Sequence, residues 1–166
     1  MPDNLTLSAP LEYGRLAPNF ELEAITGIAG QVVTRHQYRN KSGLVLIFFP
    51  PTADAQAWLQ SLDQNRAEYE ELNARVLGIG AGTRAQVQAW AGACIPPLSP
   101  FIQLFADQDL RTWQRYTGSR QPGYAVFVLD MYGGVDAQQV SESFTDMPAA
   151  ATILNWTRAA QFRCNI

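Results

Sequence analysis

An apolar run of strand length that ends at a proline corner constrains the fold of this chain most. Leu44 to Phe49 reads Leu-Val-Leu-Ile-Phe-Phe and lies between Gly43 and Pro50. Continuous apolar runs of this length are typical of strands that are covered on both faces. Beyond Pro50 the apolar residues recur at near-helical spacing. The segment therefore predicts a central strand, a tight corner and the start of a helix.

Strand and helix patterns alternate along the rest of the chain. Apolar runs at residues 76–79 and 125–129 predict two further buried strands. Turn residues at 130–134 predict a hairpin that leads into a returning strand at 135–140, and residues 13–33 predict an additional hairpin. Helical spacing and capping residues predict helices at 53–74, 83–93, 107–118 and from 146 onward. This alternation predicts an α/β protein with a central mixed sheet flanked by helices.

The composition limits the classes of function. The 166 residues fit one domain, and we expect a single unit over 1–166 with its core at about 14–162. Hydrophobic residues make up 47% and charged residues 16% of the chain, which is typical of a compact globular protein. The net charge is −3, Lys41 is the only lysine, and no basic run is present. Because nucleic-acid binding requires clustered cations, we expect no nucleic-acid partner.

Membrane, metal and disulfide signals are absent from the sequence. No stretch approaches the ~20 apolar residues that span a bilayer, so we expect no membrane segment. The first residues lack the basic start and apolar run of a secretory signal, which favours a cytoplasmic location. His36 is the only histidine, and Cys94 and Cys164 lie far apart in sequence. We therefore predict no metal site, no cofactor and no disulfide framework.

Several short motifs occur in the order in which one known family has them. They are Ala17-Pro-Asn-Phe20, Leu77-Gly-Ile79, Trp113-x-x-Tyr116-x-Gly118 and Phe127-Val-Leu-Asp130-x-x-Gly133. Together with the apolar run before Pro50, they span about 120 residues, roughly one domain. This pattern resembles the peroxiredoxin-like (AhpC/TSA, redoxin) family of the thioredoxin superfamily. The resemblance implies a thioredoxin-like, peroxiredoxin-type three-layer fold.

The residues that carry that family's chemistry are not matched. The family site is Pro-x-x-x-Thr-x-x-Cys, with an arginine six residues before the aspartate of the last hairpin. Counted from Pro50, the threonine position is Asp54 and the cysteine position is Ala57, and the arginine position is Tyr124. Asp54 would place a negative charge where the family stabilises an anion.

A second register changes the residues but not the outcome. Counted from Pro51, the two positions are Ala55 and Trp58, so neither register supplies a thiol. A peroxidatic cysteine acts as a thiolate that a helix N-terminus and a nearby cation stabilise. The resemblance therefore implies a member of the family that lacks the peroxidatic cysteine and peroxidase activity. Our leading hypothesis is a scaffold for binding or assembly, with a homodimer or another protein as partner.

Two alternatives remain open from the sequence. Cys94 is a candidate for a displaced nucleophile in a thiol-dependent antioxidant or disulfide oxidoreductase, and this predicts a low thiol pKa. Its position one turn after Trp90 and Ala91 also fits an ordinary packing role on an apolar helix stripe. The third hypothesis is a small ligand bound in a vacant pocket at the Pro50 corner, between Asp54, Ala57 and Tyr124.

Overall fold

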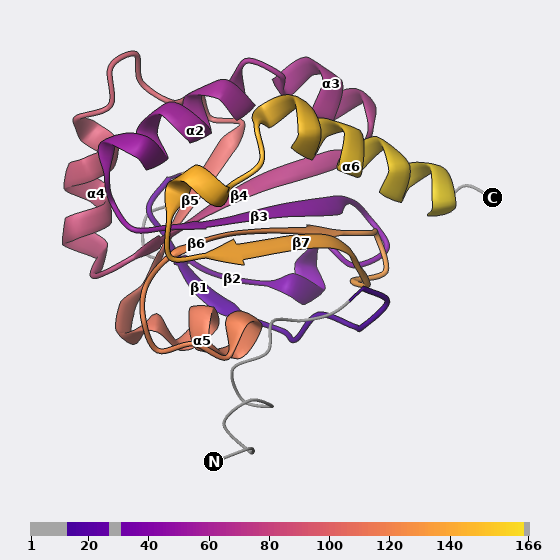
Figure 1. The fold of residues 1–166 in the computed structure, drawn as a ribbon, viewed down its shortest axis with the longest axis horizontal. Coiled ribbons are helices and arrows are strands. Elements are labelled where there is room, and N and C mark those ends of the chain that lie inside the picture. The colour runs from indigo at the N-terminus through magenta and orange to yellow at the C-terminus, as the bar shows by residue number, and fades with distance from the viewer. Residues whose placement is uncertain (1–12, 27–30, 165–166) are drawn as a thin grey trace.

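The computed structural model describes residues 13–26 and 31–164 and shows a sheet with helices on both sides (Figure 1). In chain order the elements, with η for a 3₁₀ helix, are β1 (Glu21–Ala24), β2 (Val32–Thr34), η1 (Arg35–Gln37), β3 (Gly43–Phe49), α2 (Ala53–Asp63), α3 (Arg66–Glu71), β4 (Ala74–Ala81), α4 (Arg84–Gly92), β5 (Ile102–Asp107), η2 (Gln108–Leu110), α5 (Arg111–Thr117), β6 (Tyr124–Leu129), β7 (Val135–Ser141), η3 (Phe144–Asp146) and α6 (Ala150–Cys164).

The described strands form one mixed sheet in the order β2-β1-β5-β4-β3-β6-β7. The three central strands β3, β4 and β5 are parallel neighbours. β6 and β7 extend the sheet in antiparallel fashion beside β3, and β1 and β2 do so beside β5. The predicted mixed sheet and both predicted hairpins, at 13–33 and through 130–134, are therefore confirmed.

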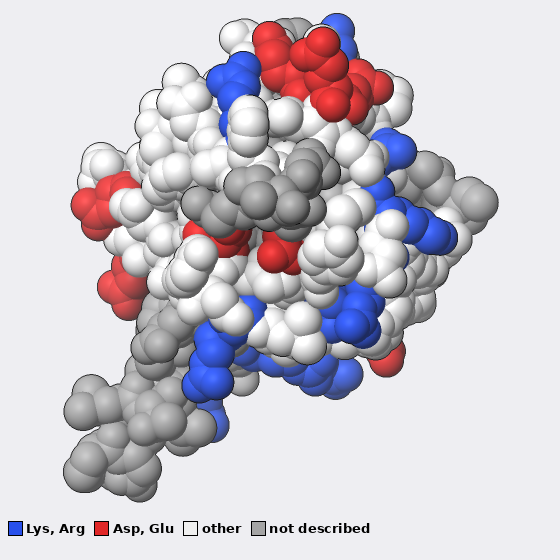
Figure 2. All heavy atoms as spheres, turned by 90° about the vertical axis from the view of Figure 1, so that its right-hand side faces the viewer, with Lys and Arg blue, Asp and Glu red and all other residues white. Residues whose placement is uncertain are grey.

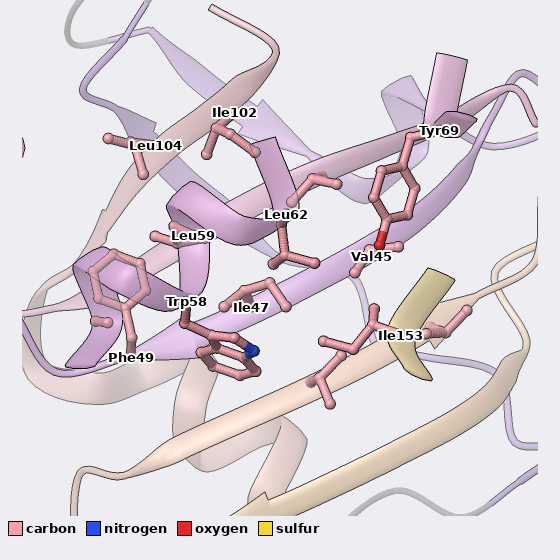
Figure 3. Close-up of a cluster of buried hydrophobic side chains, with 14 of the residues drawn as sticks. Val45, Ile47, Phe49, Trp58, Leu59, Leu62, Tyr69, Ile102, Leu104 and Ile153 are labelled. Carbon is pink, nitrogen blue, oxygen red and sulfur yellow. The ribbon is translucent and has the colours of Figure 1, made fainter. Parts of the chain in front are cut away.

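β3 lies between β4 and β6 in this sheet, and all of its residues are buried. Its odd-numbered side chains from Val45 to Phe49 face one core under α2, α4 and α6, and its even-numbered ones face a second core under α5. Figure 3 shows the first core, in which Trp58, Leu59 and Leu62 of α2 point toward β3. Burial of both faces explains why the run lacks polar residues.

Two glycines in β4 allow close packing against this strand. A Cβ on Gly80 would lie 2.8 and 2.9 Å from the two methyl groups of Val87 in α4, and 3.3 Å from the ring of Phe49. A Cβ on Gly78 would lie 2.8 Å from Leu104 in β5. Only a residue without a side chain lets α4 and the β5 side chains come this close to the sheet.

The predicted single helix at 53–74 is wrong, because two helices, α2 and α3, occupy this segment. Asn65 stands between them with φ −99° and ψ 17°, outside the helical region. Asparagine competes with helical hydrogen bonding through its side chain and therefore favours such breaks. At the end of α2, the Asp63 carboxylate accepts hydrogen bonds from the Ser99 backbone N–H (2.7 Å) and hydroxyl (2.5 Å). The break thus coincides with a contact to the loop before β5.

The predicted helix at 107–118 begins later than expected, at Arg111, because the two residues before it have positive φ. Asp107 still caps it, since its carboxylate oxygens accept the backbone N–H groups of Thr112 (3.0 Å) and Trp113 (2.8 Å). The last helix also begins later than expected, at residue 150.

Charged side chains are sparse on the surface. Figure 2 shows Lys and Arg in separate groups with uncharged residues between them, and one large group of Asp and Glu near the top of that view with smaller ones elsewhere. Among the residues that the structure describes, no helix is both long and apolar enough to cross a membrane.

Gly80→Ala tests the close packing of β4 against α4. We expect it to lower the free energy of unfolding by about 1–3 kcal/mol, because the new methyl group would overpack against the stiff side chain of Val87. Urea denaturation measures the change. The control is Gly92→Ala in α4, where no heavy atom lies within 4 Å of an added Cβ. It should be neutral or stabilising by up to about 1 kcal/mol. Equal effects at both positions would contradict the packing described.

Candidate functional site

The corner between β3 and α2 is closed by a threonine. After Pro50 and Pro51 the chain is extended at Thr52, with φ −132° and ψ 170°, and the helix follows at once. The Thr52 hydroxyl oxygen accepts the backbone N–H of Ala55 at 3.2 Å. Thr52 is therefore the N-cap of α2, which satisfies one of the free N–H groups in the first turn.

The same hydroxyl is tied to the start of β6. Thr52 Oγ1 lies 2.8 Å from the hydroxyl oxygen of Tyr124, and either group can donate this hydrogen bond. Tyr124 itself is only 6% exposed. The contact joins two segments that are 72 residues apart in the sequence and meet only in the folded sheet.

Aromatic rings pack around this hydroxyl pair. The Trp58 ring contacts those of Tyr124 and Phe144 at centroid distances of 6.3 and 5.7 Å, and the Tyr124 and Phe144 rings are 5.3 Å apart. Trp58 is only 3% exposed, and its Nε1–H donates to the carbonyl oxygen of Pro148 at 3.2 Å. We call these three rings with Thr52 the corner cluster. Tyr124, one of the residues predicted to line a vacant pocket, is thus packed against two other rings.

A second indole binds the corner from the side of α4. Trp90 Nε1–H donates to the carbonyl oxygen of Thr52 at 2.9 Å. The Trp90 ring also lies 4.7 Å from that of Phe49, the last residue of β3. The backbone of the corner is thus held by both helices that flank it.

Comparison with protein families matches residues 13–138 to the AhpC/TSA family. The chain belongs to the AhpC/TSA family. The match includes β1 to β6 and the corner itself. None of the curated proteins compared with this chain matches it.

Solved structures of peroxiredoxins share this fold. The reduced 2-Cys peroxiredoxin of Plasmodium vivax matches with a TM-score of 0.82 and 22% identity, over 94% of this chain and 85% of that chain. Plasmodium yoelii thioredoxin peroxidase I matches with a TM-score of 0.77 and 20% identity, over 93% of each chain. Mycobacterium tuberculosis AhpC matches with a TM-score of 0.76 and 14% identity, over 92% and 94%. The predicted thioredoxin-like, peroxiredoxin-type fold is therefore confirmed.

The four predicted site positions do not gather at one point in this AhpC/TSA-family chain. Tyr124 lies in the corner cluster and Pro50 is half-buried beside it, but Asp54 and Ala57 are exposed on α2. The side chain that forms a hydrogen bond with the Tyr124 hydroxyl is that of Thr52, which was not among the predicted site residues. A threonine directly before a helical pattern is an N-cap signal, and this signal could have found it.

Thr52 suggests a third register for the family motif. Counting Thr-x-x-Cys from Thr52 leads to Ala55, which is fully buried in the first turn of α2. The earlier registers lead to Ala57 and Trp58. None of these three positions holds a cysteine, so every register leaves the first turns of α2 without a thiol.

Cys94 lies outside the corner cluster, in the turn after α4. It is 3% exposed, and its thiol contacts the carbonyl oxygen of Trp90 at 3.5 Å. Burial raises the pKa of the Cys94 thiol above its ordinary value. This is opposite to the low pKa that a displaced nucleophile requires. The side chain of Cys164 lies outside the described residues.

No site for a metal ion is evident in the described ranges. Over residues 13–26 and 31–164, no group of three or more His, Cys, Asp or Glu side chains is placed to hold one. His36 is exposed in η1, and Arg120, which precedes Tyr124 in the chain, is exposed in a loop. The polar side-chain groups of the corner cluster itself are the hydroxyls of Thr52 and Tyr124 and the indole N–H of Trp58, all of them uncharged.

A double-mutant cycle tests the link between Thr52 and Tyr124. We expect Thr52→Ala and Tyr124→Phe to show a coupling free energy of about 0.5–1.5 kcal/mol, because each removes one partner of the same hydrogen bond. Urea denaturation of both single variants, the double variant and the parent protein measures it. Strictly additive effects would contradict the hydrogen bond between these hydroxyls.

Proposed function

We propose that this AhpC/TSA-family protein is a binding or assembly scaffold without cysteine-dependent peroxidase activity. One observation carries the proposal: a hydrogen-bonded hydroxyl pair and three packed rings stand at the corner where the family motif calls for a thiol and a cation. The registers considered place Ala55, Ala57 or Trp58 at the cysteine position. Tyr124, at the arginine position, contributes a hydroxyl group and no positive charge.

The chemistry of peroxide reduction supports this proposal. A thiolate attacks one peroxide oxygen, the O–O bond breaks, and the sulfur becomes a sulfenic acid. The departing oxygen needs a proton or a positive charge to stabilise it. The hydroxyl groups of Thr52 and Tyr124 can donate or accept hydrogen bonds. Unlike a thiolate, they are not oxidised by a peroxide to a counterpart of the sulfenic acid. The corner cluster therefore supplies no thiolate that could reduce a peroxide.

Cys94 offers little support for the alternative of a thiol oxidoreductase. A reactive cysteine is partly exposed and beside a positive charge or a helix N-terminus. Cys94 is buried at the C-terminal end of α4, where the helix macrodipole disfavours an anion. These features support a packing role for this thiol.

A second copy of the chain is the partner that the sheet edges favour. β7 is the last strand on its side of the sheet. Its first residue, Val135, exchanges backbone hydrogen bonds of 2.8 Å with Gly14 and Arg15. Because edge strands can pair with another chain, we propose a homodimer built on β7.

A peroxide-consumption assay tests the absence of catalysis. With hydrogen peroxide and either thioredoxin or dithiothreitol as reductant, we expect consumption at the rate of the reductant alone. Rapid turnover by the purified protein, abolished by Cys94→Ser, would overturn the proposal and support the thiol enzyme.

Ala55→Cys and Ala57→Cys form a matched pair at two of the three candidate positions. We expect neither to reach more than about one thousandth of the activity of a cysteine peroxidase, because no cation stands at Tyr124 to stabilise the departing oxygen. The same assay measures both. Ala57→Cys serves as the exposed control for the buried Ala55→Cys. Robust turnover by either variant would show that the remaining site is intact.

Light scattering coupled to size-exclusion chromatography tests the homodimer. We expect a mass of about twice 18.4 kDa at micromolar concentrations. A mass of 18.4 kDa at all accessible concentrations would contradict a dimer and leave a different protein as the partner.

A further inference from the structure

A cavity of about 580 Å³ lies at the edge of the sheet and shares no lining residue with the corner cluster. It opens where β1 and β5 separate, since these strands pair only at Glu23–Ala106 and Ala24–Phe105. The opposite wall is formed by the end of α4 and the loop before β5. Cavities of this volume accommodate small organic ligands.

The loop wall of the cavity is held in place by α2. Asp63 accepts hydrogen bonds from the backbone N–H and the hydroxyl of Ser99, and Gln60 Nε2 donates to the carbonyl oxygen of Pro96 at 2.7 Å. The prolines at 96, 97 and 100 restrict the backbone of this loop further. A wall with these constraints exists before any ligand binds, so little ordering entropy opposes binding.

The sheet wall is fixed by side-chain hydrogen bonds as well. The Leu104 backbone N–H donates to Thr26 Oγ1 at 3.0 Å, which continues the strand pairing through a side chain. Tyr38 donates its hydroxyl hydrogen to Gln103 Oε1 at 2.8 Å. Two donors remain uncommitted in these contacts: the Thr26 hydroxyl hydrogen and the amide group of Gln103.

The lining determines the charge of a suitable ligand. None of the described lining residues is Asp, Glu, Lys, Arg or His, and most of them are apolar. Burial also raises the pKa of Tyr38, so this hydroxyl stays neutral at physiological pH. A charged ligand would lose hydration here without gaining an opposite charge. An uncharged molecule with an apolar body meets no such cost.

We propose that this cavity binds an uncharged, largely apolar small molecule that carries a carbonyl-type acceptor toward Gln103 and Thr26. The acceptor would take up the two hydrogen-bond donors, and the apolar body would cover Ala91, Pro97 and Leu98, which are not fully buried. The proposal is independent of the corner cluster and of the proposed scaffold role.

A pair of fluorescent naphthalenes tests the chemical class. Prodan is an uncharged ketone, whereas anilinonaphthalene sulfonate is an anion of similar size. We expect saturable one-to-one binding of prodan, at least about tenfold tighter than that of the sulfonate. In ¹⁵N-edited NMR spectra of the full chain, prodan should shift the amide signals of Thr26, Gly92 and Gln103. Tighter binding of the sulfonate, absence of saturable prodan binding, or shifts confined to other residues would each overturn the proposal.

Gly92→Trp blocks the cavity and provides the second test. Gly92 lines the cavity and has open space beside it, so the indole can be accommodated in the last turn of α4. We expect prodan binding to weaken at least about tenfold. The control Ala85→Trp adds the same ring to an exposed position two turns earlier, outside the lining, and should bind prodan like the parent protein. Unchanged binding by Gly92→Trp would overturn the proposal. Should that variant fail to fold, the NMR shifts in the parent protein decide.

Discussion

The burial of β3 on both faces is the constraint on which the rest of the structure depends. This seven-residue strand lies between β4 and β6 and contributes side chains to both cores. Because neither face can shift without exposing apolar surface, the register with β4 and β6 is strongly specified. That register pairs Phe48, near the end of β3, with Ala125, near the start of β6. The position of the corner therefore follows from the packing of the sheet.

At this corner, a hydroxyl pair and packed aromatic rings join α2 to β6. The Thr52 hydroxyl caps α2 and bonds to Tyr124, and the rings of Trp58 and Phe144 enclose the pair. A thiolate would need a positive charge and access to water, whereas these contacts are uncharged and largely buried. The same strand-corner-helix geometry thus stabilises the junction of α2 and β6. The chain shares its fold with peroxiredoxin structures at 14–22% identity, and a shared fold does not by itself imply a shared site.

The sheet was predictable because apolar runs and turn residues are local signals. The pairing of Thr52 with Tyr124 has no such signal, since it arises only when β3 and β6 align across the sheet. An ungapped count from Pro50 therefore selected Asp54 and Ala57, which are exposed on α2. The break at Asn65 was missed because the apolar spacing on either side fits one helix as well as two. The edge cavity depends on where β1 leaves β5, which no short motif records.

Sulfenic acid trapping tests whether the folded protein has a reactive cysteine, because it reports on each sulfur separately. The folded protein is exposed to hydrogen peroxide with dimedone present, and each cysteine peptide is then followed by mass spectrometry. We expect no adduct at Cys94 in the folded protein, since burial disfavours its thiolate. After unfolding, we expect the same thiol to be alkylated readily. A dimedone adduct at Cys94 that forms within seconds in the folded protein would show that Cys94 is a reactive thiol and contradict the proposed scaffold role.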